Sequence, residues 1–127
     1  MQGHSFSLPT YRASRDDFDL LSALDTYEAS STRVVETWFD VHAASVFAAQ
    51  IEAIREHVLA IPGLTVPGLL LVIAHCELAS TLWQNASVGV SMATLEEVRL
   101  RHHLAVGALR AAVIASAATI RAQRSGT

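Results

Sequence analysis

The sequence predicts an all-α protein, a three- or four-helix antiparallel bundle with a helical homodimer interface. It has 127 residues, of which 51% are hydrophobic and only 17% are charged, so one domain can bury a core without disulfides or a structural metal. Apolar residues recur at helical spacing along most of the chain, and no segment shows the alternation of a credible strand. The six glycines and three prolines are too few for a loop-rich fold.

The predicted organisation is a single domain with two short ends. Residues 1–13 mix polar and aromatic side chains around Pro9 and are interpreted as a flexible N-terminal arm. Residues 14–124 are interpreted as one helical-bundle domain, and residues 125–127 as a C-terminal tail.

The first helix is expected to begin at Ser14. A serine is a good N-cap, and Asp16 and Asp17 would lie in the first turn, where the helix dipole favours acids. The polar cluster at residues 29–32 weakens the helix but contains no glycine or proline. Two helices, 15–30 and 33–60, or one continuous rod both fit this pattern.

Two neighbouring apolar stripes mark the second helical stretch. The first stripe comprises Val35, Phe39, Val46, Ala49 and Ala53, and the second comprises Phe47, Ile51, Ile54, Val58 and Ile61. A turn is expected at residues 62–68, where two Pro-Gly pairs occur.

The third helix is expected at about residues 68–86. It is apolar on most of its surface, and Glu77, Thr81 and Gln84 mark its solvent-exposed side. After a loop around Gly89, the last helix is expected at about residues 94–123. Thr94 and Glu97 have the spacing of a capping box at its start.

The last helix carries the predicted dimer interface. Small and apolar residues cover a broad arc of its surface, so two such helices can approach each other closely. One chain of this size offers limited cover for that arc, which favours a symmetric second copy. The predicted interface residues are Leu100, Leu104, Gly107, Ala111 and Ala118.

Charge divides the chain into an acidic body and a basic last helix. Residues 98–127 contain five arginines and no acid, while residues 1–97 contain four arginines and twelve acids, a net charge of −8. The basic patch is thin and the isoelectric point is about 6.0, which argues against nucleic acid and favours an acidic protein surface as partner. The predicted partner-binding residues are Arg99, Arg110, Arg121 and Arg124.

Three histidines on inward-facing helix surfaces raise an alternative function. His42, His75 and His102 are candidates for a metal or haem site in a bundle core, although the chain has neither a Glu-x-x-His pair nor an HExxH motif. A buried, neutral pair of histidines also predicts that acid loosens the core.

Histidine phosphotransfer is a second alternative, with His75 and His103 in loosely matching surroundings, but the chain contains no lysine to steady a phosphoryl group. Cys76 is the lone cysteine, and no Gly-rich phosphate loop or nucleophile elbow is present. The chain is therefore expected to be non-catalytic and to use no cofactor.

The compartment expected from the sequence is the cytoplasm. The N-terminus lacks the apolar core of a signal peptide. The uncharged stretch between Glu56 and Glu77 is interrupted at residues 62–63 and 67–68, so a spanning helix is not expected. The function predicted overall is a small protein–protein interaction domain: an adaptor, a chaperone-like protein or a regulatory factor.

Overall fold

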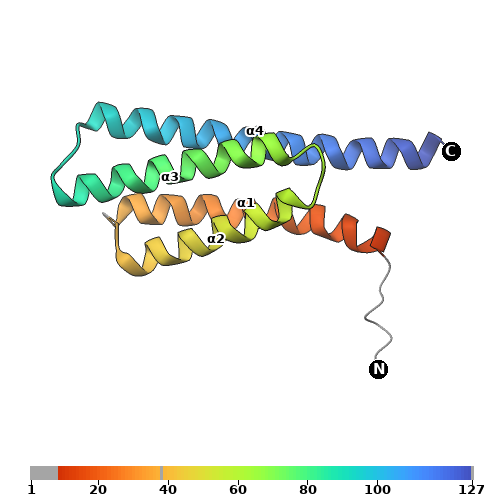
Figure 1. Cartoon of the computed structure of the whole chain (residues 1–127), viewed down its shortest axis with the longest axis horizontal. Helices are drawn as coiled ribbons and strands as arrows, with labels where there is room; N and C mark the ends of the chain where they lie inside the picture. Colours follow the sequence, from red (N-terminus) through yellow and green to blue (C-terminus); the bar gives the residue numbers. More distant parts are fainter. Residues whose placement is uncertain (1–8, 38, 127) are drawn as a thin grey trace, which may run out of the picture.

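A computed structural model describes residues 9–37 and 39–126, with side chains described for residues 20–37 and 39–123. Every regular element in these residues is a helix, and they contain no strand. The four helices are α1 (Pro9–Glu36), α2 (Val41–Leu59), α3 (Thr65–Ser87) and α4 (Met92–Gly126) (Figure 1). The all-α prediction is confirmed.

The helices lie side by side as two antiparallel hairpins, α1–α2 and α3–α4 (Figure 1). α1 contacts α2 and α4, and α3 contacts the same two helices, so each helix has two neighbours. α4 is the longest at 35 residues, and its C-terminal part extends past the point where α3 begins (Figure 1).

The core lies between the two hairpins and takes one stripe from each helix. In α2 only the second of the two expected stripes is buried, whereas Val46, Ala49 and Ala53 of the first stripe are exposed. Two neighbouring helices cover only one side of α2, which explains the difference. The largest fully buried apolar side chains are Tyr27, Phe47, Leu20, Leu24, Ile54, Leu64, Leu71, Leu78, Leu109, Val34, Val58 and Val106.

The first half of the chain forms two helices rather than one rod. α1 runs through residues 29–32 without a break and ends at Glu36, and α2 begins at Val41. Asp40 is the N-cap of α2, and its Oδ2 accepts a hydrogen bond of 2.9 Å from the Ala43 N–H. At the other end, α1 already begins at Pro9, so Ser14 lies inside a helix and its expected capping role is wrong.

The start of α4 also differs from the expectation. The Ser91 hydroxyl accepts a hydrogen bond from the Thr94 N–H at 3.1 Å and donates one to Thr94 Oγ1 at 2.8 Å. The predicted capping box of Thr94 and Glu97 is therefore replaced by a Ser91 cap. Glu97 instead forms an ion pair with Arg101, one turn further along the helix.

Gly68 sets the distance between α2 and α3. A Cβ atom at this buried position would lie 2.5 Å from Val58 Cγ2, which is well inside van der Waals contact. We expect Gly68→Ala to lower the free energy of unfolding by about 1–2 kcal/mol, since the overpacking exceeds the gain in helix propensity.

Urea unfolding measures this effect, and the same Gly68→Ala substitution is also measured in a Val58→Ala variant. Shortening Val58 removes the nearest atoms, so the penalty of Gly68→Ala is expected to shrink by about 1 kcal/mol in the double-mutant cycle. Strict additivity of the two substitutions would contradict a close approach of α2 and α3 at this point.

Candidate functional site

A buried polar cluster joins α1, α3 and α4 at the centre of the core. The Tyr27 hydroxyl lies 2.7 Å from His75 Nδ1 and 2.8 Å from His102 Nε2. Tyr27 is fully buried, and His75 and His102 are 7% and 4% exposed. We call these three residues the Tyr–His cluster.

α2 contributes an aromatic ring that covers the cluster. The rings of Tyr27 and Phe47 stack with centroids 4.9 Å apart and planes at 18°, and Phe47 lies 4.3 Å from the His75 ring. Aromatic stacking of this kind adds about 0.5–1.5 kcal/mol beyond the burial of area. All four helices therefore meet at this cluster.

The cluster has two possible arrangements of its protons. A phenol has one proton, so Tyr27 donates to one imidazole and accepts from the N–H of the other. Either Tyr27 donates to His75 and His102 donates to Tyr27, or the direction of both bonds is reversed. Reversal changes the tautomers of His75 and His102 without changing the net charge.

Burial keeps the cluster neutral at physiological pH. The pKa of His75 and that of His102 are lowered to about 4, mainly by desolvation, and the neighbouring His75 and His103 contribute to the lowering for His102. Desolvation also raises the pKa of Tyr27 well above its ordinary value. The cluster can therefore hold α1, α3 and α4 in fixed relative positions. A reversal of one of its two hydrogen bonds also reverses the other.

The structure places the three predicted metal-binding histidines at two separate locations. His75 and His102 face the core, whereas His42 is exposed on α2 beside Ser30 and Arg33, so the three do not converge. Within residues 20–37 and 39–123, no group of three or more His, Cys, Asp and Glu side chains is arranged to hold a metal ion. Burial of His75 also hides it from a phosphoryl donor.

Sequence reasoning missed Tyr27 as the partner of the two histidines. The available signal was its spacing from Leu20 and Leu24, which places a phenol on the buried stripe of α1. A buried phenol needs a hydrogen-bond partner, and two inward histidines are the natural candidates.

The arginines of α4 have different surroundings from one another. Arg110 donates to Asp25 Oδ1 at 2.6 Å and to Glu28 Oε1, so this predicted partner-binding residue instead ties α4 to α1. Arg101 similarly binds Glu77 of α3 at 2.8 Å. Arg99 and Arg121 are exposed, and the side chain of Arg124 lies outside the described residues.

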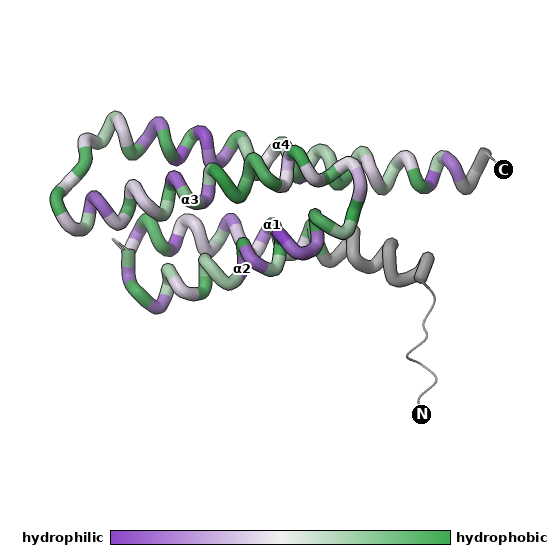
Figure 2. The backbone as a smooth tube through the Cα atoms, in the orientation of Figure 1, coloured by the Kyte–Doolittle hydropathy of each residue, from purple (hydrophilic) through white to green (hydrophobic). Residues whose placement is uncertain are grey.

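An apolar surface covers the outer sides of α3 and α4, which we call the α3/α4 face. On α4 all five predicted dimer-interface residues are exposed, Leu104 by 61%. In Figure 2 the N-terminal half of α3 is mostly coloured as hydrophobic, whereas its C-terminal half mixes hydrophobic and hydrophilic residues. The large side chains of this face are Val66, Leu69, Leu70, Ile73, Leu100, Leu104 and Ile114.

α3 and α4 are both long and apolar enough to cross a membrane, as judged by length and composition alone. Core helices of soluble proteins meet the same criteria. In α3, 39% of the most apolar 18-residue window is buried within the protein, and in α4 only 17%. The low value for α4 reflects the open α3/α4 face.

Comparison with known protein families, with curated proteins and with solved structures finds no match to this chain.

The Tyr–His cluster predicts a loss of stability in acid. The pKa values of His75 and His102 in the folded chain, about 4, lie below the ordinary value of 6.5. Between these limits the unfolded chain binds protons that the folded chain excludes. The free energy of unfolding therefore falls as the pH is lowered from 6.5 to 4, by up to about 1.4 kcal/mol per pH unit for each histidine.

Urea unfolding at several pH values between 7 and 4.5 tests this dependence. His42→Gln, a change in an exposed histidine outside the cluster, is the control and should retain it. Stability that is unchanged between pH 7 and 5 would show that the two imidazoles are not held neutral.

Removing the phenol hydroxyl tests the hydrogen bonds directly. Tyr27→Phe keeps the ring beside Phe47 but leaves His75 Nδ1 and His102 Nε2 without their partner, so we expect a loss of about 1–3 kcal/mol. Adding His75→Leu and His102→Leu removes the orphaned groups and should recover part of that loss in urea unfolding. Additive losses in the triple variant would argue against the hydrogen bonds as the cause.

Proposed function

We propose that the chain is an antiparallel four-helix bundle that forms a homodimer through the α3/α4 face. In this proposal it acts as a small, non-catalytic protein–protein interaction domain of the cytoplasm, as an adaptor, chaperone-like protein or regulatory factor. The observation that carries the proposal is the concentration of exposed aliphatic side chains on one face of the molecule.

The α3/α4 face is continuous across the two helices. Arg101 of α4 pairs with Glu77 of α3, so these turns of the two antiparallel helices lie side by side. One turn away from that pair, α4 presents Leu104 and α3 presents Ile73, which are 61% and 64% exposed. Monomeric soluble proteins rarely expose contiguous apolar patches larger than a few hundred Å², so a face of this kind favours a covering partner.

A second copy of the chain suits this face in shape. Gly107, Ala111 and Ala118 lie along the outer side of α4 and are exposed. Apart from the adjoining backbone of its own helix and its two chain neighbours, nothing lies within 4 Å of the position that a Gly107 Cβ would take. Small residues in such a line allow two helix backbones to approach closely, and twofold symmetry lets the same line serve both copies.

Charge favours an antiparallel pairing of the two α4 helices. Glu96 and Glu97 lie in the N-terminal part of α4, and Arg121 lies near its C-terminal end. A contact centred on Gly107 would place Leu100 of one copy opposite Ile114 of the other, with acids and arginine brought together at both ends. Antiparallel helix dipoles also attract each other.

An acidic protein surface is the further partner that the charge pattern supports. Arg110 is engaged by Asp25 and Glu28, so this part of the proposal rests on Arg99 and Arg121. A guanidinium group recognises carboxylates through paired hydrogen bonds, and both of these side chains are exposed.

The dimer proposal predicts that a charge on the α3/α4 face separates the copies. Wild-type protein at micromolar concentration should sediment as a dimer in analytical ultracentrifugation. Leu104→Glu and Ile73→Glu should each raise the dissociation constant of the dimer at least tenfold, because a buried unpaired carboxylate in the interface is costly.

Val41→Glu is the matched control, since Val41 is 73% exposed on α2, outside the α3/α4 face. This variant should remain dimeric. A wild-type monomer at these concentrations would refute the proposal. Pelleting of the wild type with phosphatidylcholine vesicles, abolished by Leu104→Glu, would assign the face to a lipid surface instead.

A further inference from the structure

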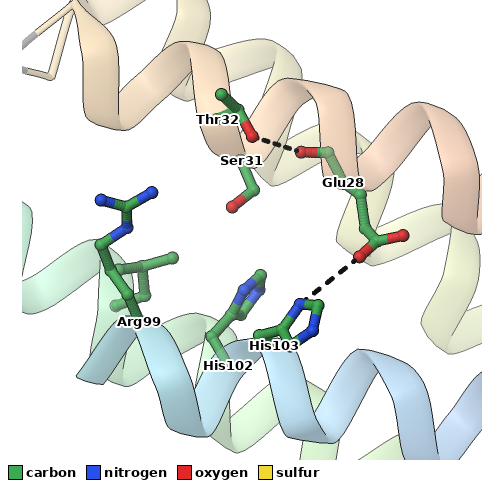
Figure 3. A pocket seen from close by; sticks show the side chains of 7 residues that line it. Glu28, Ser31, Thr32, Arg99, His102 and His103 are labelled. Carbon is green, nitrogen blue, oxygen red and sulfur yellow. Dashed lines mark hydrogen bonds and ion pairs between the residues drawn. The ribbon is translucent and has the colours of Figure 1, made fainter. Parts of the chain in front are cut away.

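A polar cavity of about 120 Å³ lies between α1 and α4, beside the Tyr–His cluster (Figure 3). It lies towards α1, so it is separate from the α3/α4 face. Its volume accommodates several waters or one small anion. The lining residues are Glu28, Ser31 and Thr32 of α1, Leu78 of α3, and Arg99, His102 and His103 of α4.

The charges at this cavity are unevenly compensated. Glu28 supplies the one carboxylate among the lining residues, and Arg110 binds its Oε1. Its Oε2 lies 3.9 Å from His103 Nδ1. Arg99, across the cavity from Glu28 in Figure 3, forms no ion pair with any described residue. Because Arg110 is shared between Glu28 and Asp25, these three groups together keep a net charge of −1, and Arg99 is the cation of the cavity lining that remains available to an anion.

His102 adds a buried group with an open hydrogen-bonding position. The residue is only 4% exposed and lines the cavity, and its Nε2 is held by Tyr27. Its Nδ1 forms no hydrogen bond with a described residue, and it is not among the fully buried atoms that lack a partner, so it keeps access to solvent. Because His102 lines the cavity, this nitrogen is available to a water or a ligand that enters it.

We propose that this cavity binds a small tetrahedral oxyanion of the size of phosphate. The Arg99 guanidinium supplies a charged fork, and the Ser31 hydroxyl and the His102 Nδ1–H supply further donors from opposite walls. No covalent step is involved. This site is independent of the proposed dimer interface, since it uses the other side of α4.

Anion binding also selects one proton arrangement of the Tyr–His cluster. An anion requires a proton on His102 Nδ1, so His102 Nε2 must accept from Tyr27. Tyr27 then accepts from His75 Nδ1, which fixes the tautomer of His75 on α3. The presence of the anion is thus transmitted across the core without a change in its net charge.

Nuclear magnetic resonance of protein with ¹⁵N-labelled histidine tests both steps. Inorganic phosphate is titrated at pH 7, with sodium chloride holding the ionic strength constant. Saturable changes are expected in the ring nitrogens of His102 and His75, with His102 moving to the Nδ1–H tautomer. Arg99→Gln should weaken binding at least tenfold, and Ser31→Ala should weaken it severalfold.

Arg121→Gln is the matched control, because Arg121 is an exposed arginine of the same helix outside the cavity. It should bind phosphate as the wild type does, and the thermal midpoint of Arg99→Gln should equal that of the wild type. Changes that fail to saturate, or equal binding by Arg99→Gln, would overturn the proposal. Binding without any change at His75 would overturn the transmission across the core.

Discussion

The Tyr27 hydroxyl is the contact on which the relative positions of the helices depend. Hydrophobic burial stabilises the core but has no direction, so by itself it allows one helix to slide or rotate against another. A phenol held between His75 and His102 at 2.7 and 2.8 Å allows far less freedom. A buried donor or acceptor without a partner costs about 1–3 kcal/mol, and a displacement of Tyr27 would break both hydrogen bonds. α1, α3 and α4 are thereby held in a single register.

The three surfaces of α4 follow from that register. With His102 turned towards Tyr27, Arg110 reaches Asp25 and Glu28 of α1, and Arg101 on another side reaches Glu77 of α3. The remaining side carries Leu104 and the small residues, which are exposed among the residues that the structure describes. Ion pairs at the surface contribute little stability each, but here they confirm the rotation that the buried cluster imposes.

Local pattern was sufficient to predict the helices and the inward direction of His75 and His102. It was insufficient for contacts between residues far apart in the chain. Tyr27 and His102 are separated by 75 positions, and Arg110 and Asp25 by 85, and no spacing rule connects such pairs. Helix starts failed for a different reason. Ser91 and Thr94 are both good caps, and only the geometry of the turn selects Ser91.

Neutrality of the cluster links the two proposed surfaces of α4. Both the cavity towards α1 and the apolar face on the far side require α4 to keep its rotation, and this rotation depends on two uncharged imidazoles. Reversal of the proton arrangement changes the tautomers of the two histidines without placing a charge in the core. Binding of the proposed anion in the cavity therefore leaves the packing behind the α3/α4 face unchanged. Protonation of His75 or His102 instead places a poorly solvated charge beside Phe47, which destabilises the packing of all four helices at once. The buried pair of imidazoles therefore permits an exchange of tautomers, which leaves the core neutral, and penalises protonation, which does not.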